Sequence, residues 1–305
     1  MTETKQDIRR VIALGVFDGV HIGHGALLEK VKERSAQLNA VPAVLTFDIH
    51  PDYFVNAAKV ELINSPEERV ELIRRLYGID DVIMFPFNRE VMMMPWDAFL
   101  RRVIDDYHAE AFVVGEDFTF GYKGEGNAEK LSGFASENQM LCDVIAPVIL
   151  DGVRVSSTQI REYIRNGEME KASKNLGHPY CFTDIVRYGF QLGRTISAPT
   201  VNMLFPPCAV IPKYGVYASE AFLEDGRGFH AITNVGVRPT VSNGASVNAE
   251  SHLLDFCEDL YGQRVRIELL SFLRQEMRFE NLDALSAQIK ADTESAREFF
   301  ESYRR

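Results

Sequence analysis

Short apolar runs alternate with amphipathic segments through the first half of the chain. Four runs have the length of a buried strand, at residues 11–14, 40–47, 81–87 and 111–115. Three other segments carry apolar residues at helical spacing, at 25–38, 66–77 and 95–107. The second of these has Ser65 as its cap, Pro66 at its first position and Gly78 at its end. This alternation predicts a parallel sheet with helices on its faces.

The pattern changes after residue 180. Short runs are separated there by clusters of Gly, Pro and Asn, and in 265–269 apolar and charged side chains alternate strictly. Antiparallel strands of this kind form either a barrel or a sandwich. An apolar stripe that begins at Leu282 predicts a final helix packed against the strands.

Residues 166–179 separate the two patterns. They are polar and end in Gly177 and Pro179, which is typical of a helix end followed by a linker. A chain of 305 residues is long enough for two domains of ordinary size, each with its own core. We therefore predict one domain over residues 1–178 and a second over residues 179–305.

A glycine-rich stretch, GVFDGVHIGH at residues 15–24, joins the first predicted strand to the first predicted helix. Its three glycines permit backbone conformations and close approaches that a Cβ would block. The helix beyond presents free N–H groups to an anion, and His21 and His24 add imidazole donors. The stretch is neither the dinucleotide fingerprint GxGxxG nor a P-loop, which needs a Gly-Lys-Ser or Gly-Lys-Thr ending. It predicts a phosphate site of another kind.

Three further stretches of the first half carry polar groups suited to a nucleotide. Asp48 and His50 follow a predicted strand, at the edge of a parallel sheet where ligands bind. The glycine-punctuated loop 115–131 offers a carboxylate and aromatic faces to a planar ligand, from Asp117, Phe118 and Phe120. A later helix begins with hydroxyl groups and has a cation one turn in, from Ser156, Ser157, Thr158 and Arg161. Each feature alone is more often a helix cap or a solvated surface residue, but together they suggest a single nucleotide site.

Three places in the second half carry polar residues that the folding of a barrel does not require. Thr200 and Asn202 end a glycine-punctuated segment, and residues two apart on an extended chain face the same ligand, such as a hydrated magnesium ion. The stretch NVGVRPT at residues 234–240 is the second place. The third is Glu250, which a period of two puts on the face opposite Ala249. Ordinary explanations also exist, because Thr-x-Asn can stabilise a turn and Glu250 can be an exposed strand carboxylate.

Composition narrows the class of protein. Hydrophobic residues make up 46% of the chain and charged residues 25%, as in a soluble globular protein. The net charge of -11 argues against broad binding to nucleic acid or to a membrane surface, so an anionic substrate needs a local basic pocket. The N-terminus has no apolar core of signal-peptide length, and no run approaches the roughly 20 apolar residues of a membrane span, so we expect a cytoplasmic protein. The four cysteines are widely spaced without a CxxC pair, and we expect buried thiols instead of a metal site or disulfides.

The motifs GVFDGVHIGH, TFDIHP, VVGEDFTFG and VSSTQIR, in this order, resemble the adenylyltransferase module of the bacterial bifunctional riboflavin kinase/FMN adenylyltransferases, also called FAD synthetases. The HxGH and SSTxIR pair is shared more widely among nucleotidylyltransferases, whereas the DFTFG loop and the TFDIHP strand end point to the flavin branch. In the second half, GRT, PTVN, NVGVRPT and ESHLLDFCEDLYG are similar to the riboflavin kinase module of the same family. The resemblance covers nearly the whole chain. It implies an α/β, Rossmann-like nucleotidylyltransferase domain followed by an all-β domain, a six-stranded antiparallel barrel with a C-terminal helix.

The resemblance implies two reactions. ATP would phosphorylate riboflavin to FMN and adenylylate FMN to FAD with release of pyrophosphate, with Mg²⁺ as the cofactor. The catalytic residues implied are Glu250 as the general base of the kinase, and His21, His24 and Arg161 at the phosphates in adenylyl transfer. The residues implied to bind ATP or phosphate are Gly15, Phe17, Asp18, Gly19, Gly23, Ser156, Ser157, Thr158, Gly193, Arg194, Thr200 and Asn202. Those implied to bind flavin are Asp117, Phe118, Phe120, Asn234 and Arg238, and those implied to bind the metal are Thr200 and Asn202.

The chain departs from the family pattern at three places. Ile196, Ser197 and Ala198 stand where the kinase segment usually has Leu-Gly-Phe, Asp184 stands where a glycine is usual, and Thr119 replaces the usual Arg of the DFxFG loop. Loss of two glycines from a segment that covers phosphates is expected to restrict its backbone or to direct a carboxylate toward ATP. Three hypotheses therefore stay open. They are a bifunctional enzyme, an FMN adenylyltransferase with a degenerate kinase domain that only binds flavin, and a flavin- or nucleotide-binding regulator without turnover.

Overall fold

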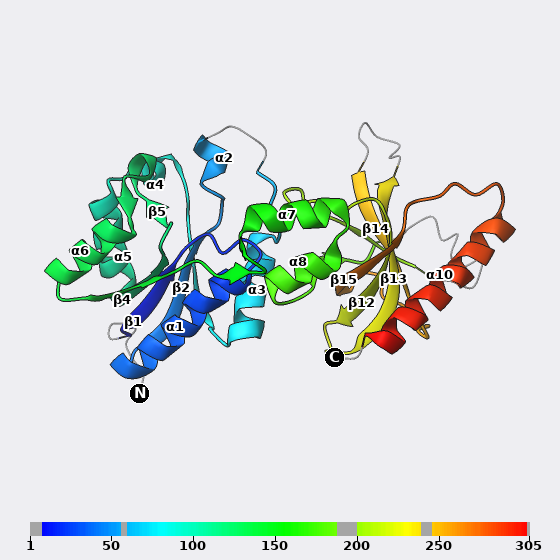
Figure 1. Cartoon of the computed structure of the whole chain (residues 1–305), viewed down its shortest axis with the longest axis horizontal. Helices are drawn as coiled ribbons and strands as arrows, with labels where there is room; N and C mark the ends of the chain where they lie inside the picture. The colour runs from blue at the N-terminus through cyan, green and yellow to red at the C-terminus, as the bar shows by residue number, and fades with distance from the viewer. Residues whose placement is uncertain (1–7, 56–59, 188–199, 239–245, 304–305) are drawn as a thin grey trace. The chain divides into compact units, whose positions relative to one another are not determined.

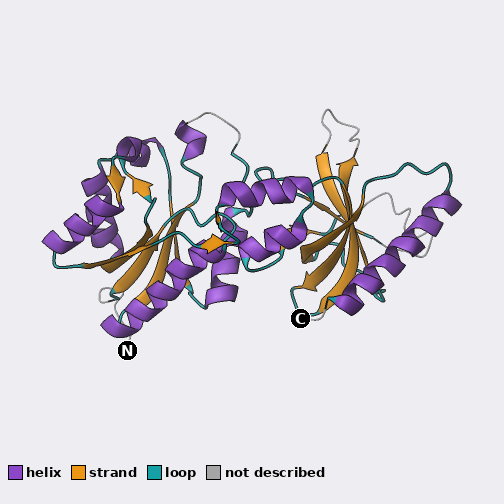
Figure 2. Ribbon diagram, viewed as in Figure 1, coloured by secondary structure: helices purple, strands orange, loops and turns teal. Residues whose placement is uncertain are grey.

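The structure, a computed structural model, describes residues 8–55, 60–187, 200–238 and 246–303. The chain forms two compact units, each with its own sheet and helices (Figures 1 and 2). The first unit contains residues 1–61 and 65–157, and the second contains residues 62–64 and 158–305. The boundary expected from the sequence lies after residue 178, and the limits of the functional domains stay a prediction.

The first unit is built on a sheet of five parallel strands in the order β3-β2-β1-β4-β7. The strands are β1 Arg10–Leu14, β2 Val41–Phe47, β3 Asp81–Phe85, β4 Ala109–Gly115 and β7 Leu141–Ile145. The first four coincide with the apolar runs of the sequence, while β7 was not predicted because all five of its residues are exposed or partly exposed. All carboxyl ends of the strands lie at one edge of the sheet, which is where ligands bind in this architecture.

Helices cover both faces of this sheet (Figure 2). On one face, Phe85 and Phe112 pack with Phe99 and Leu131 from two helices in a hydrophobic core. On the other face, the first long helix lies against β1, β2 and β4. The helices are α1 Ile22–Leu38, α2 Asp52–Val55, α3 Pro66–Tyr77, α4 Arg89–Met92, α5 Trp96–Tyr107, η1 Tyr122–Gly124 and α6 Ala128–Glu137. Two small hairpins complete the unit, β5 Thr119–Phe120 with β6 Gly126–Asn127, and β8 Ile149–Leu150 with β9 Val153–Arg154.

Helix α3 begins and ends as its sequence predicted. The Ser65 side chain accepts the N–H of Glu68, and the Glu68 carboxylate accepts the N–H of Ser65, which forms a complete capping box. Pro66 occupies the first helical position, and Gly78 closes the helix in the left-handed conformation with φ 66°.

The second unit is a six-stranded antiparallel sheet in the order β10-β15-β12-β13-β14-β11. The strands are β10 Tyr180–Ile185, β11 Val201–Leu204, β12 Gly215–Leu223, β13 Gly228–Arg238, β14 Ser246–Leu253 and β15 Arg264–Arg274. A bridge between Arg187 and Asn202 joins the two outer strands, so the sheet curls into a nearly closed barrel. The second unit is therefore a barrel and not a sandwich. Helix α10 (Leu282–Ser302) packs Ala296 and Phe299 against Val216 and Ile232 on the outer face of the barrel.

The interpretation of residues 166–179 as a linker was wrong. Helix α7 (Ser157–Asn166) is followed almost at once by α8 (Met169–Leu176), which contacts β10 and β15. Met169, Ala172 and Leu176 are buried and stand at helical spacing, so the apolar stripe was present in the sequence among many polar residues.

Two smaller expectations also need correction. The loop 115–131 ends early, because Asn127 caps α6 by accepting the N–H of Lys130 and the helix begins at Ala128. The four cysteines are free thiols as expected, but only Cys181 is buried and Cys257 is exposed. Within the described ranges, no helix combines the length and apolar character that crossing a membrane requires.

Candidate functional site

The turn between β1 and α1 is conformationally strained. Phe17, Gly19 and Val20 adopt positive φ values of 56°, 82° and 43°, a region that a β-branched valine rarely enters. The side chains of Phe17 and Val20 are fully buried, so the core of the first unit holds the backbone in this shape. The strain therefore lies at the carboxyl edge of the sheet, where the sequence predicted a phosphate site.

His21 and His24 form a stacked pair at the start of α1. The Nδ1 atom of His21 accepts the N–H of His24 at 3.2 Å, which makes His21 the N-cap of the helix. The two rings lie 3.6 Å apart between centroids with an interplanar angle of 9°. A Cβ at Gly23 would lie 3.0 Å from Cε1 of His21, so glycine at this position keeps room for the pair.

Burial lowers the pKa of His24 well below its ordinary value of 6.5, and the nearby His21 and Arg69 lower it further. The His24 ring is therefore neutral near pH 7 and presents one N–H donor and one acceptor. Its Nδ1 atom is buried and has no hydrogen-bond partner within the described part of the chain. A neutral donor at a helix N-terminus is suited to phosphate oxygens.

Arg69 lies in the same region and was not predicted as a site residue. This arginine of α3 is 1% exposed, and its NH1 donates to Oγ1 of Thr46 at 2.8 Å and to the carbonyl oxygen of Phe47 at 3.1 Å. The Thr46 hydroxyl in turn donates to the carbonyl oxygen of Val16 at 2.8 Å. These bonds tie the carboxyl end of β2 to the strained turn. The signal in the sequence was a positively charged residue among the buried positions of α3, three residues before Leu72.

Of the four residues predicted at the start of α7, two belong to the first unit. The Ser157 hydroxyl donates to the carbonyl oxygen of Asp18 at 2.9 Å, and Asp18 is 2% exposed. This bond places Ser157 beside the HxGH turn. Thr158 and Arg161 belong to the second unit, so their place at the same phosphates stays a prediction.

The loop after β4 presents some of its predicted flavin contacts to solvent and buries others. Phe118 stacks on Phe120 with centroids 5.4 Å apart, but Phe120 is only 6% exposed and belongs to the core beside Trp96. Asp117 is exposed and pairs with Arg154 of β9. A flavin contact is therefore open to Asp117 and Phe118, while that of Phe120 would require its neighbours to move. Direct flavin binding by this loop stays a prediction.

The candidate kinase residues meet in one cross-strand row of the barrel. Asn202 of β11 lies directly opposite Glu250 of β14, and Glu250 lies directly opposite Asn234 of β13. Directly opposite residues in a ladder have Cβ atoms about 5 Å apart and share a face of the sheet. Ala249 and Leu253, on the other face, are buried, which confirms the predicted orientation of Glu250. Three motifs that are far apart in the sequence thus converge through strand register alone.

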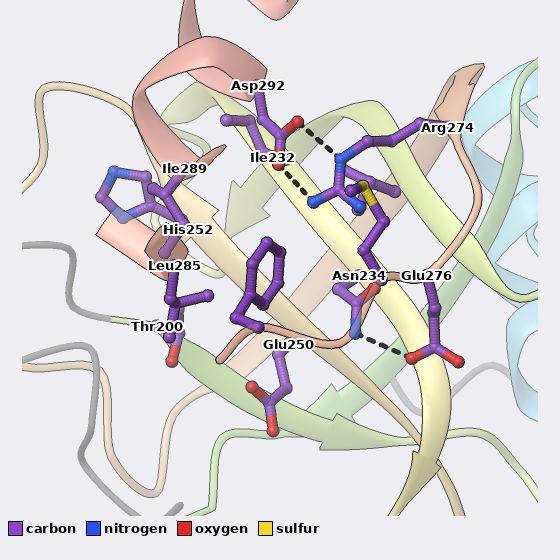
Figure 3. Close-up of a pocket in the computed structure, with 13 residues that line it drawn as sticks. Thr200, Ile232, Asn234, Glu250, His252, Arg274, Glu276, Leu285, Ile289 and Asp292 are labelled. Carbon is purple, nitrogen blue, oxygen red and sulfur yellow. Dashed lines mark hydrogen bonds and ion pairs between the residues drawn. The ribbon is translucent and has the colours of Figure 1, made fainter. Parts of the chain in front are cut away.

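Two members of this row, Glu250 and Asn234, lie at a pocket between the barrel and α10 (Figure 3). Thr200, Asn234 and Glu250 line it together with apolar side chains from both sides. Those apolar side chains are Val216, Ile232, Met277, Phe279, Leu285 and Ile289. A pocket with a wide apolar wall and a few convergent polar groups suits a planar organic ligand.

Hydrogen bonds and ion pairs fix the polar rim of the pocket. Glu250 accepts a hydrogen bond from the amide of Asn248 at 3.2 Å, which orients its carboxylate. The amide of Asn234 donates to Glu276 at 3.3 Å (Figure 3). Arg274 makes two bonds of 2.7 Å to Asp292, and this bidentate pair anchors α10 over the pocket (Figure 3).

Sequence reasoning missed Arg274, Glu276 and Asp292. Asp292 is 6% exposed and stands on the apolar stripe of α10, so a charged residue at a buried helical position was again the available signal. Gly193 and Arg194, also predicted, lie outside the described residues, as does the side chain of Arg238 at the end of β13.

The fold and the two sites define the class of protein. A helix N-terminus with stacked histidines at the carboxyl edge of a parallel sheet fits a nucleotidylyltransferase, and it is followed along the chain by a barrel with a carboxylate at a partly apolar pocket. Residues 3–159 match the family model described as FAD synthetase, and residues 176–300 match the one described as riboflavin kinase. The chain belongs to the bifunctional riboflavin kinase/FMN adenylyltransferase family.

The similarity to known proteins extends over nearly the whole chain. The bifunctional riboflavin kinase/FMN adenylyltransferase of Haemophilus influenzae is 36% identical over 95% of this chain and 94% of its own length. The protein of the same name from Listeria monocytogenes is 33% identical, covering 98% and 95%, and that of Escherichia coli K12 is 34% identical, covering 95% and 92%. A crystal structure from Streptococcus pneumoniae, described as a macrolide-efflux protein, has a TM-score of 0.82 and 28% identity, covering 97% of this chain and 96% of that one.

The lowered pKa of His24 predicts a pH-dependent stability of the first unit. Below pH 6.5 the unfolded chain protonates His24 while the folded protein does not, so the unfolded state binds more protons and stability falls as the pH falls. Between pH 7.5 and 5.5, we expect His24→Gln to lose less stability than the wild type, because glutamine binds no proton in either state. Urea unfolding followed by the fluorescence of the single tryptophan, Trp96 of the first unit, measures this.

The matched control is His108→Asn, at the exposed left-handed C-cap of α5. It should leave the pH dependence of unfolding as it is in the wild type. Equal pH dependence in His24→Gln and the wild type would contradict a neutral, buried His24.

Proposed function

We propose that this protein makes FMN from riboflavin and ATP in its barrel, and then FAD from FMN and a second ATP in its first unit. The observation that carries the proposal is the row Asn202, Glu250 and Asn234, which brings three kinase motifs to one pocket edge. A protein that only binds flavin has no need for a carboxylate at this point. The two matched family models, in this order along the chain, support both halves of the proposal.

Glu250 acts as the general base of the kinase step. The nucleophile is a primary alcohol of riboflavin, which is almost fully protonated near neutral pH. A positioned carboxylate that accepts this proton contributes about 10²- to 10⁴-fold in rate. The hydrogen bond from Asn248 orients Glu250, and the apolar wall of the pocket receives the flavin ring, with Asn234 at its polar edge.

Thr200 and Asn202 bind the ATP phosphates together with Mg²⁺. A hydroxyl and an amide oxygen are hard oxygen donors, and these would fit a largely hydrated Mg²⁺. In the part of the chain that the structure describes, no group of three or more His, Cys, Asp or Glu residues is placed to hold a metal. That also fits Mg²⁺, which commonly takes one or two protein ligands and completes its shell with water and phosphate. When bound, the ion neutralises phosphate charge.

Adenylyl transfer requires a different set of groups. The nucleophile is the FMN phosphate, whose second pKa near 6 leaves it mostly dianionic at pH 7, so no base is needed. The requirement is to align and neutralise two phosphates that approach each other. The N-terminus of α1 and the His21–His24 pair supply fixed donors at the α-phosphate of ATP, and Arg161, Ser156 and Thr158 complete the pocket in this proposal.

The substrates are accordingly ATP, riboflavin and FMN, and the products are FMN, FAD, ADP and pyrophosphate. We infer a cytoplasmic enzyme without nucleic-acid or membrane partners, on the basis of its net charge of -11 and its small-molecule pockets.

The deciding experiment is incubation of the purified protein with riboflavin, ATP and Mg²⁺, followed by separation of the flavins by chromatography. We expect FMN and then FAD. FMN without FAD would remove the adenylyltransferase half of the proposal, and FAD formed only from added FMN would remove the kinase half. Binding without any turnover would leave the regulator hypothesis in place of the enzyme.

Substitution Glu250→Gln should lower riboflavin phosphorylation by about 10²- to 10⁴-fold, because the amide cannot accept the proton of the alcohol. FAD formation from added FMN should be unchanged, since Glu250 is not among the residues proposed for adenylyl transfer and lies on β14 of the barrel. Glu224→Gln, at an exposed position beside the turn between β12 and β13, is the matched control and should retain both activities. Full kinase activity in Glu250→Gln would exclude this base.

Substitution His24→Ala should lower FAD formation from FMN by about 10²- to 10³-fold, the usual cost of removing one preorganised donor to developing charge. Phosphorylation of riboflavin should continue at the wild-type rate. His108→Asn again serves as the control. A parallel loss of both activities would show that the variant disrupts folding, and retention of FAD formation would rule out a role for His24.

A further inference from the structure

The two outer strands of the barrel meet next to the proposed ATP site. β10 and β11 stand at opposite ends of the strand order. The N–H of Arg187 donates to the carbonyl oxygen of Asn202 at 2.9 Å. Beside this bond, Oδ2 of Asp184 accepts the N–H of Leu204 at 2.8 Å. A side chain of β10 thus supplies an acceptor to the backbone of β11.

Asp184 is the residue that stands where the family resemblance expects glycine. The departure from glycine led to the expectation that a carboxylate would be directed toward ATP. In the structure, the Asp184 carboxylate instead contacts other groups of the protein. Besides the bond to Leu204, Oδ1 lies 3.1 Å from NH2 of Arg187 and Oδ2 lies 3.3 Å from Nε of the same guanidinium. The carboxylate is therefore occupied and its charge is balanced, and its side chain is only 18% exposed.

The two partners of Asp184 do not contribute equally. The Arg187 side chain is 55% exposed, and an ion pair with so exposed a partner contributes little to stability. The bond to the Leu204 N–H is shorter and more sheltered, and a carboxylate acceptor makes it a charge-assisted bond. We therefore assign the main effect of Asp184 to its hold on β11.

The hydrogen bond from β11 to Asp184 also helps to fix the position of Asn202. β11 has only four residues, and on its other edge it pairs with β14 so that Asn202 lies opposite Glu250. On the β10 side, the bonds at Asn202 and Leu204 lie two residues apart along the strand and fix the same short segment. With glycine at position 184, the backbone bond from the Arg187 N–H to Asn202 would remain. The side-chain bond to the Leu204 N–H would be lost.

We propose that Asp184 is a positioning residue for the kinase step, holding β11 so that Asn202 stays in register with Glu250 and Thr200 keeps its place directly before the strand. The inference rests on the proposed kinase function of the barrel. It assigns to this chain a side-chain clamp in place of a glycine, and it makes the departure from the family pattern compatible with activity. Because Asn202 is on β11 and Thr200 directly precedes it, loosening the strand weakens the use of MgATP in the kinase step. Riboflavin binding and adenylyl transfer do not depend on it.

Three variants at this position separate the clamp from the charge. Asp184→Ala removes both the acceptor and the charge, and should raise the KM for ATP in riboflavin phosphorylation by about 3- to 10-fold. Asp184→Asn keeps an oxygen acceptor for the Leu204 N–H without the charge, and should bring the KM for ATP most of the way back to the wild-type value. Asp184→Gly should resemble Asp184→Ala. In all three, the KM for riboflavin and the rate of FAD formation from FMN should equal those of the wild type.

Hydrogen exchange gives a readout that does not depend on activity. Peptides that contain Val201–Leu204 should exchange faster in Asp184→Ala than in the wild type, and Asp184→Asn should be protected again. Faster exchange with an unchanged KM for ATP would reduce Asp184 to a structural residue and overturn the proposal.

Two further outcomes would also overturn it. Kinase efficiency above the wild type in Asp184→Gly or Asp184→Asn would show that the carboxylate hinders ATP. Unchanged kinetics in Asp184→Ala, with an active wild type, would remove this inference and leave the proposed function intact. A wild type that forms no FMN from riboflavin would instead remove the proposed function, and this inference with it.

Discussion

The register between β11, β14 and β13 is the constraint on which the kinase half depends. Side chains alternate between the two faces of a strand, so a slip of one residue would turn Glu250 into the barrel interior and bring Ala249 to the pocket. The buried residues around the row resist such a slip, because Ala249 and Leu253 would leave the core together. Asn202, Asn234 and the pocket wall all take their positions from this one alignment.

The two proposed sites are built by different physical means. In the first unit, a strained turn and a helix N-terminus aim backbone and imidazole donors at one place, and the buried side chains of Phe17 and Val20 hold the strain. In the second unit, the backbone is ordinary extended strand and the polar groups meet through pairing across strands. The first arrangement is local in sequence, and the second is assembled from segments that are far apart.

That difference explains how much the sequence predicts. The glycine-rich turn, the capping box of α3 and the orientation of Glu250 are local patterns, and the structure confirms the turn, the cap and the face of the strand. Strand order, and with it the meeting of Asn202, Glu250 and Asn234, is not written in any local period. The family resemblance predicted the barrel, whereas the periodicity of the sequence was compatible with either a barrel or a sandwich. Arg69 and Asp292 were missed for a related reason, since each is a charged residue on a buried helical stripe whose partner lies on another element.

The short outer strand β11 also has a consequence for the order of folding. β12, β13 and β14 follow one another along the chain, and they can pair as neighbours without the rest of the barrel. β11 precedes them in sequence but pairs with the last of the three, so its docking closes a long loop and carries a larger entropic cost. The three-stranded meander by itself holds Glu250 and Asn234 in register, and it lacks Asn202. The phosphate side of the kinase site is therefore completed only when the barrel closes.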